Sequence, residues 1–355
     1  MATIELESVT KRWGPTTGVD NVSFNVNSGS FAILLGPSGC GKSTTLRMIA
    51  GLEEVTEGRL RIGGDDVTDA PPSERALSMV FQSYALFPHL NVAENIVFGL
   101  KVRKVPAGER VKRLERVAEI VGLQEVLERK PGQLSGGQRQ RVALARAIIA
   151  ENDICLMDEP LSNLDAKLRH DMRVEIRALQ QRLNMTVIYV THDQAEAMSM
   201  GDKVILMRDG RIEQEGTPEE LYERPMTTFA ASFIGTPPMR LLDLVSGSGG
   251  MVAKGENSTN ILELTDRPMK VGIRPEHITI SDSRGLPAEL VSADYLGSET
   301  MIDARIGGQP VLVRQPGQMK LTKPTKARLS WSGSDVHVFD AASGKRNDDL
   351  KAYDL

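Results

Sequence analysis

Short apolar runs alternate with helical stretches over the first 235 residues. FAILLG at 31–36, DICLMDEP at 153–160 and TVIYVTHD at 186–193 carry the continuous apolar runs of strands buried on both faces. KSTTLRMIAGL at 42–52 reads as a helix that a glycine ends, and AKLRHDMRVEIRALQQRL at 166–183 reads as a long amphipathic helix. This alternation predicts an α/β domain over residues 1–235 with a largely parallel sheet.

Two parts of this domain depart from the alternation. Residues 3–10 and 22–26 alternate polar and apolar positions, as strands with one buried face do. From about residue 86 to residue 150 helical periodicity dominates, and VKRLERVAEIVGL at 111–123 places its Val, Leu and Ile residues on one stripe. We therefore expect a helical subdomain over about 86–150.

The pattern changes again at GTPPMR, residues 235–240. Beyond it, short β-type segments such as KVGI at 270–273, PVLVR at 310–314 and DVHVF at 335–339 are separated by Gly, Pro, Ser and Asp turns. This spacing predicts a second domain over 236–355, a small all-β barrel or sandwich. Residues 341–355 are polar, and we expect a poorly anchored tail there.

Composition narrows the class of protein. A length of 355 residues suits two domains, and a net charge of −4 with a pI near 5.9 argues against a dedicated nucleic-acid binder. Cys40 and Cys155 make no disulfide framework, which favours a reducing, cytosolic compartment. The first residues lack the apolar core of a signal peptide, and no apolar run is long enough to span a bilayer. If the protein works at a membrane, we expect another protein to cross it.

GPSGCGKST at 36–44 fits the phosphate-binding pattern G-x-x-x-x-G-K-[ST] and lies between an apolar strand and a helix. Its glycines let the backbone N–H groups face a β-phosphate, while Lys42 supplies positive charge and Ser43 a hydroxyl for Mg²⁺. Cys40 reads as a small loop filler rather than a nucleophile. The predicted nucleotide-binding loop comprises Gly36, Pro37, Ser38, Gly39, Cys40, Gly41, Lys42, Ser43 and Thr44.

Such a loop requires an acidic partner for its metal ion. The strand ICLMD delivers Asp158 at its carboxyl end, and Glu159 follows directly. We expect Asp158 to anchor Mg²⁺ through its water shell and Glu159 to accept a proton from the attacking water. The alternative is a solvated acidic turn after a strand, but the phosphate-binding loop favours the catalytic interpretation.

Two further polar residues end strands of the same predicted sheet. His192 follows VIYVT, and Gln82 follows SMVF. Because ligands bind at the carboxyl ends of strands in open α/β sheets, we expect His192 to contact the γ-phosphate and orient Glu159. Gln82 is expected to contact the metal shell and the attacking water. The predicted catalytic set is Lys42, Gln82, Glu159 and His192, and the predicted Mg²⁺ set is Ser43, Gln82 and Asp158.

LSGGQRQR at 134–141 is a second element with the features of a phosphate site. Ser135, Gly136 and Gly137 present a hydroxyl and bare backbone N–H groups where a helix begins, and Gln138 completes the element. An ordinary helix cap by Ser135 is also expected, but it does not explain the paired glycines. Trp13 is either a core residue or an aromatic face for adenine.

The order of these motifs, with SNLD at 162–165 included, resembles the nucleotide-binding subunit of an ABC transporter over the first 235 residues. The resemblance implies that two subunits pack head to tail, with each ATP between the nucleotide-binding loop of one chain and LSGGQ of the other. It also implies that Asp165 links the two sites and that Trp13 stacks on adenine. A soluble ABC ATPase of DNA repair or translation is a competing class, but the coiled-coil insertion or second ATPase head usual there is missing.

The segment 83–100, SYALFPHLNVAENIVFGL, resembles the importer type of these subunits, in which it forms a groove for a short coupling helix of the membrane partner. Exposed apolar side chains such as Tyr84, Leu86 and Phe87 would suit such a docking site. The alternative is that the helical subdomain covers them.

Residues 236–355 resemble the oligonucleotide-binding-fold-like regulatory domain of carbohydrate-importer ATPases. The resemblance rests on PMRLLDL at 238–244, VGIRPEHI at 271–278 and LGSETMIDARIGG at 296–308, and Arg240 departs from the Asn expected at its position. The region has as many acidic as basic residues and few aromatic ones, which argues against nucleic-acid binding.

Together these resemblances predict the ATPase of a bacterial binding-protein-dependent importer for a sugar, a polyol or a related carbohydrate. An importer for a different class of solute is the alternative. The expected cofactors are ATP and Mg²⁺. The expected partners are a second copy of the chain, two transmembrane permease subunits that dock near residues 83–100 and, indirectly, an extracytoplasmic solute-binding protein. The expected location is the cytoplasmic face of the inner membrane, as a peripheral protein.

Overall fold

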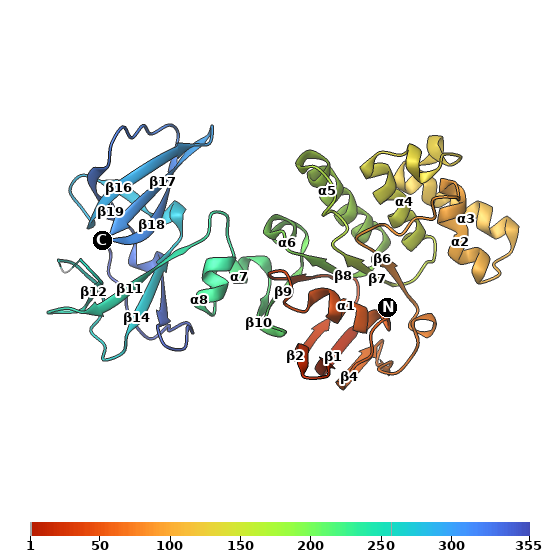
Figure 1. The fold of residues 1–355 in the computed structure, drawn as a ribbon, viewed down its shortest axis with the longest axis horizontal. Helices are drawn as coiled ribbons and strands as arrows, with labels where there is room; N and C mark the ends of the chain where they lie inside the picture. The colour runs from red at the N-terminus through yellow and green to blue at the C-terminus, as the bar shows by residue number, and fades with distance from the viewer. Residues whose placement is uncertain (1, 257) are drawn as a thin grey trace. The chain divides into compact units, whose positions relative to one another are not determined.

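A computed structural model of the chain describes residues 2–256 and 258–355 (Figure 1). The chain divides into two compact units, one that ends at Pro218 and one that begins at Glu219. The predicted α/β pattern fills the first unit, and the predicted β-rich pattern fills most of the second.

A six-stranded sheet forms the centre of the first unit, in the order β10-β9-β3-β8-β7-β6. All of its pairs are parallel except that of β9 with β10, so the prediction of a largely parallel sheet is confirmed. Every residue of β3, β7 and β8 is buried, as their continuous apolar runs require. The strands are β3 (Phe31–Leu35), β6 (Leu77–Val80), β7 (Ile154–Asp158), β8 (Thr186–Thr191), β9 (Lys203–Arg208) and β10 (Arg211–Gly216).

The alternating segments near the N-terminus form a separate antiparallel sheet in the order β2-β1-β4-β5. One apolar core joins side chains of this sheet, of helix α1 (Lys42–Ala50) and of the parallel sheet. Gly51 ends α1 with a left-handed backbone (φ 73°), as the sequence predicts. The strands are β1 (Ile4–Trp13), β2 (Thr16–Val26), β4 (Glu57–Ile62) and β5 (Asp65–Asp66).

Three helices of the first unit pack on one another: α2 (Val92–Val102), α3 (Ala107–Val121) and α4 (Gly136–Ile148) (Figure 1). They correspond to the helical region expected over about 86–150. Helix α5 (Ala166–Leu183) has the bounds of the amphipathic stretch that predicts it, because Asp165 caps its first turn and Asn184, with φ 51°, ends it. Helix α6 (Gln194–Met200) follows β8.

The second unit contains two five-stranded antiparallel sheets around one apolar core, as the segmented β pattern predicts. The first sheet has the order β13-β12-β11-β14-β20, and the second has the order β15-β19-β16-β17-β18. The strands are β11 (Arg240–Ser246), β12 (Met251–Ala253), β13 (Asn260–Leu262), β14 (Met269–Ile273), β15 (Thr279–Ser281), β16 (Leu286–Tyr295), β17 (Glu299–Ile306), β18 (Gln309–Pro316), β19 (Thr325–Ser330) and β20 (Val336–Asp340).

The sequence pattern predicts that the second domain begins at residue 236. In the structure the second unit begins 17 residues earlier, at Glu219. One contact between residues 219–235 and the β-rich strands is made by Arg274, a fully buried residue that follows β14. Its guanidinium donates to the carbonyls of Tyr222 (2.6 Å) and Ile234 and lies 4.0 Å from the Tyr222 ring. It thereby holds α7 (Pro218–Glu223) and α8 (Thr228–Phe233) to the β-rich unit.

The prediction of a poorly anchored C-terminal tail is wrong. Leu350, Ala352 and Leu355 pack against the core of the second unit. The backbone N–H groups of Tyr353 and Leu355 donate to the carbonyls of Ile261 and Trp331, both at 3.0 Å. The tail is polar in composition, but its few apolar residues find a hydrophobic surface to cover.

We predict that Arg274→Gln lowers the free energy of unfolding of the second unit by about 3 kcal/mol or more, because buried carbonyls of Tyr222 and Ile234 lose their charged donor. Arg267→Gln, a change at an exposed residue, is the control and should cost less than about 0.5 kcal/mol. Fluorescence of the buried Trp331 during denaturation, in a Trp13→Phe background, reports this unit alone. Equal stabilities of the two variants would contradict the role given to Arg274.

Candidate functional site

The loop between β3 and α1 has the conformation that its glycines permit. Gly36, Gly39 and Gly41 have φ values of 152°, 81° and 101°, where L side chains are rare. A Cβ on Gly36 would lie 2.3 Å from the carbonyl oxygen of Met207, and one on Gly41 would lie 2.8 Å from that of Gly18. A Cβ on Gly39 would meet nothing within 4 Å, so this part of the loop is open to a ligand.

Lys42 begins α1 and is buried, and its Nζ donates to the carbonyls of Gly36 (2.8 Å) and Pro37 (2.9 Å). The charge is therefore held inside the loop, where phosphate oxygens would lie. Cys40 is buried, and this burial raises the pKa of its thiol above the usual value. A thiol with a raised pKa is a poor nucleophile, in agreement with a filling role for Cys40.

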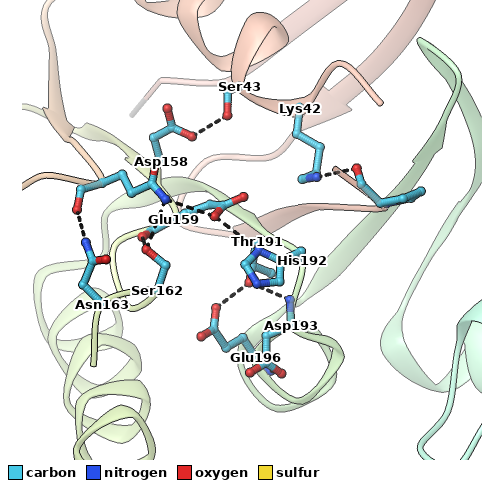
Figure 2. A network of polar contacts seen from close by, with 12 residues as sticks. Lys42, Ser43, Asp158, Glu159, Ser162, Asn163, Thr191, His192, Asp193 and Glu196 are labelled. Carbon is cyan, nitrogen blue, oxygen red and sulfur yellow. Dashed lines mark hydrogen bonds and ion pairs between the residues drawn. The ribbon is translucent and has the colours of Figure 1, made fainter. Parts of the chain in front are cut away.

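Asp158 ends β7, and one of its carboxylate oxygens, Oδ1, accepts a hydrogen bond from the Ser43 hydroxyl at 2.7 Å (Figure 2). Among the described residues, no group of three or more His, Cys, Asp or Glu side chains could hold a metal by itself. Mg²⁺ in nucleotide sites takes one or two protein oxygens together with phosphate oxygens and water. The Ser43–Asp158 pair fits an ion of this kind that arrives with a nucleotide.

Glu159 has a left-handed backbone, with φ at 43°, which is costly for a residue with a side chain. Its N–H donates to the Val190 carbonyl of the neighbouring strand at 3.1 Å, and its carbonyl accepts from the Ser162 hydroxyl at 2.9 Å. These contacts hold the turn in place. As a result the carboxylate is presented beside the end of β8 instead of continuing along β7 (Figure 2).

His192 and Gln82 both face this carboxylate. The Nδ1 atom of His192 lies 3.2 Å from Glu159 Oε2, and Gln82 Nε2 donates to the same oxygen at 3.4 Å and to the Ser162 hydroxyl at 3.3 Å. Gln82 therefore adjoins the predicted base, and the Mg²⁺ contact expected of it remains a prediction. Lys42, Ser43, Asp158, Glu159 and His192 lie together after the ends of β3, β7 and β8 (Figure 2). Gln82, after β6, joins them through its hydrogen bond to Glu159.

A buried polar network supports the loop that carries His192, and the sequence patterns did not single it out. Glu196 accepts hydrogen bonds from the hydroxyls of Thr191 (2.6 Å) and Tyr189 (2.9 Å), and its burial raises the pKa of its carboxyl. The Thr191 hydroxyl in turn accepts from the N–H of Asp193 at 3.0 Å (Figure 2). The only signal of this network in the sequence is a run of polar residues after the apolar strand β8.

Trp13 ends β1, and 45% of its surface is exposed, so it is not a core residue. Its indole N–H donates to Glu53 at 3.2 Å, and its ring lies against Gly18, where a Cβ would approach to 2.3 Å. An exposed, laterally fixed ring is compatible with stacking on a base.

Ser135 caps α4, and its hydroxyl and the Gln138 side chain form a reciprocal capping box with distances of 3.3 and 3.0 Å. Gly136 and Gly137 also have an explanation within the chain. A Cβ on Gly136 would lie 3.1 Å from Leu164 Cδ2, and one on Gly137 would lie 2.9 Å from Leu168 Cδ1. The paired glycines thus let α4 approach the start of α5, a reason that the sequence alone did not reveal.

Two family models match the chain: "ABC transporter" at residues 19–162 and "TOBE domain" at residues 271–339. An sn-glycerol-3-phosphate import ATP-binding protein of Agrobacterium fabrum is 49% identical over 98% of this chain and 95% of its own length. A trehalose/maltose import ATP-binding protein of Thermococcus litoralis is 45% identical over 97% of this chain and 99% of its own length.

The chain belongs to the ATP-binding proteins of ABC transporters. It is an ATPase, as members of this family are. The dimeric structure of a post-hydrolysis state of an ATP-binding cassette bound to ADP and Pi has a TM-score of 0.54 with this ABC ATPase. That structure is 34% identical and covers 61% of this chain and 98% of its own chain. Within the described residues, no helix combines the length and the apolar character needed to cross a membrane.

We predict that Glu159→Gln leaves ATP binding by this ABC ATPase intact and lowers turnover about a hundredfold or more, as the loss of a general base does. Binding of a fluorescent ATP analogue and release of phosphate measure the two quantities separately. Glu215→Gln, which removes a carboxylate that pairs with Lys203, is the control and should keep normal turnover. Near-normal phosphate release by Glu159→Gln would exclude Glu159 as the base.

Proposed function

We propose that this ABC ATPase hydrolyses ATP to drive the uptake of a sugar, a polyol or a related carbohydrate. The observation that carries the proposal is similarity over nearly the full length, through both units, to ATP-binding proteins named for glycerol-3-phosphate and for trehalose and maltose import. The site supports the chemistry, because the groups expected to bind phosphate and Mg²⁺ and to activate water lie at one edge of the parallel sheet.

Each of these side chains has a role that its position allows. Backbone N–H groups of the loop after β3 and the Lys42 ammonium would hold the β- and γ-phosphates. Ser43, Asp158 and Gln82 would hold Mg²⁺, which would supply positive charge to the phosphate oxygens. Glu159 would take the proton of the attacking water. His192 would hold Glu159 through Nδ1 and meet the γ-phosphate through its other ring nitrogen.

The second half of each site would come from a second copy of the chain. Ser135 caps the 13-residue helix α4 and Gly137 lies in its first turn, so the Ser135 hydroxyl and the Gly137 N–H group suit an anion. In this arrangement Ser135 and Gly137 contact the γ-phosphate of the ATP bound by the other copy. Because ADP has no γ-phosphate, only ATP stabilises the closed dimer. Asp165 lies near the dimer axis. Closure and opening would then move the membrane subunits.

We predict that Ser135→Arg leaves the affinity of the isolated chain for ATP within about twofold and removes most of the turnover. Wild-type turnover per chain should rise with protein concentration, because two chains are needed for each site. Fast turnover that does not depend on concentration would refute the shared site.

The membrane subunits would dock on the face formed by Phe87, Phe98 and Val102. The centroids of the Phe87 and Phe98 rings lie 4.4 Å apart. Phe98 is 36% exposed, and Val102, one turn farther along α2, is 67% exposed. Tyr84, which was expected on this face, is buried. Arg146 of α4 donates to the carbonyls of Tyr84 (2.7 Å) and Ala85 (2.6 Å), which folds this residue inward.

We predict that Phe98→Asp prevents assembly with the permease subunits while ATP binding is unchanged, because a carboxylate would be buried in an apolar contact. Val174→Asp, at an exposed apolar residue of α5, is the control and should assemble normally. Co-purification with co-expressed permease subunits measures assembly. Normal assembly of Phe98→Asp would place the docking face elsewhere.

The substrate class is tested by ATPase activity in the assembled complex with its solute-binding protein. Stimulation by a sugar, a polyol or a glycerol phosphate supports the proposal. Stimulation by an amino acid, a peptide or a metal ion alone would refute the carbohydrate class and leave the import function in place.

A further inference from the structure

Arg169, in the first turn of α5, joins two loops of the site that lie far apart in the sequence. Its Nη2 donates to the Leu164 carbonyl in the SNLD segment at 3.0 Å, and its Nη1 donates to Asp193 Oδ2 at 3.3 Å. Leu164 belongs to the loop after β7, and Asp193 belongs to the loop after β8. One guanidinium therefore spans the gap between them.

The Asp193 end of this bridge adjoins the predicted catalytic pair. Asp193 follows His192 directly, and its Oδ1 accepts the N–H groups of Ala195 and Glu196 at the start of α6. Its other oxygen faces Arg169, so the two carboxylate oxygens have separate partners. Arg169, His192 and Glu159 line one small cavity of about 20 Å³, together with Ser162, Thr191, Asp193 and Glu196.

The Leu164 end of the bridge adjoins the helix that carries Ser135. Leu164 and Leu168 pack where Gly136 and Gly137 lack side chains. A Cβ on Gly136 would lie 3.1 Å from Leu164, and a Cβ on Gly137 would lie 2.9 Å from Leu168. Farther along, Arg141 of α4 pairs with Glu175 of α5 at 2.9 Å. The start of α4 is thus packed against the start of α5, which is where Arg169 is attached.

We propose that Arg169 is a positioning residue that couples the two roles of each chain in hydrolysis. It ties the loop of His192, whose side chain contacts Glu159, to the face of α4 that this chain offers to the site of a second copy. The proposal rests on the shared-site arrangement above. When the start of α4 is pressed onto the ATP of the other copy, Leu164, Leu168 and Arg169 carry the displacement to Asp193 and His192 in the same chain.

The chemistry of the Arg169 side chain favours a positioning role over a stabilising one. A planar guanidinium directs its N–H groups at two acceptors in fixed directions, whereas a lysine ammonium is a compact charge whose donors have no fixed directions. The ion pair is about one-third exposed, with side-chain exposures of 32% and 27%, and such pairs stabilise folded proteins only slightly. Its loss should therefore alter the position of the loop more than the stability of the chain.

The test uses the full chain at concentrations where wild-type turnover per chain is constant. Arg169→Gln removes both contacts, and Asp193→Asn keeps Oδ1 for the α6 cap while its amide NH₂ replaces the oxygen that faces Arg169. We expect both variants to lower kcat about tenfold or more, to lower the Hill coefficient for ATP toward one, and to keep single-chain ATP affinity within about twofold. Arg169→Lys should restore part of kcat.

Arg177→Gln is the matched control, because Arg177 lies two turns farther along α5 and also pairs with an aspartate, Asp202. It should keep the wild-type kcat and Hill coefficient. The proposal would be overturned if Arg169→Gln and Asp193→Asn both kept the kcat and the Hill coefficient of the wild type. It would also be overturned if the two variants lost kcat and single-chain ATP affinity by the same factor. If Arg169→Gln fails to fold, Asp193→Asn decides alone. Fast wild-type turnover per chain at every protein concentration would instead refute the shared site.

Discussion

Parallel pairing of β3, β8, β7 and β6 is the constraint on which the site depends. Parallel strands end at the same edge of a sheet, so four loops from distant parts of the chain converge there. Each strand end contributes different side chains to the site. These are Lys42 and Ser43 after β3, Gln82 after β6, Asp158 and Glu159 at the end of β7, and His192 after β8. Because β3, β7 and β8 are buried on both faces, the apolar core fixes the positions of the polar groups at their ends.

The active groups of this chain are partnered before any ligand arrives. Lys42 is bound to loop carbonyls, Ser43 to Asp158, and Glu159 to His192 and Gln82. Preorganised groups of this kind lose little freedom when a substrate replaces the internal contacts. The left-handed backbone of Glu159 is the strained element, and the hydrogen bonds to Val190 and Ser162 offset its cost.

The sequence predicts what depends on local pattern and on strand order. The loop after β3 and the acids that end β7 were predicted because apolar runs locate strand ends, and strand ends locate ligands. Features that depend on long-range contacts were not predicted. Tyr84 is buried through Arg146, 62 residues away, and Gly137 is needed beside Leu168. Arg274 likewise binds the carbonyls of Ile234 and Tyr222, which lie 40 and 52 residues away in the sequence.

The central claim is that each ATP site combines the nucleotide-binding loop of one copy with the LSGGQ element of another. Mixing Lys42→Ala chains with Ser135→Arg chains tests it most directly, since each variant alone lacks one half of both sites. In a mixed pair, one site joins the intact loop of the Ser135→Arg chain to the intact LSGGQ of the Lys42→Ala chain. The account predicts ATP turnover well above the sum of the two separate variants. Turnover equal to that sum, with mixed pairs shown to form, would contradict it.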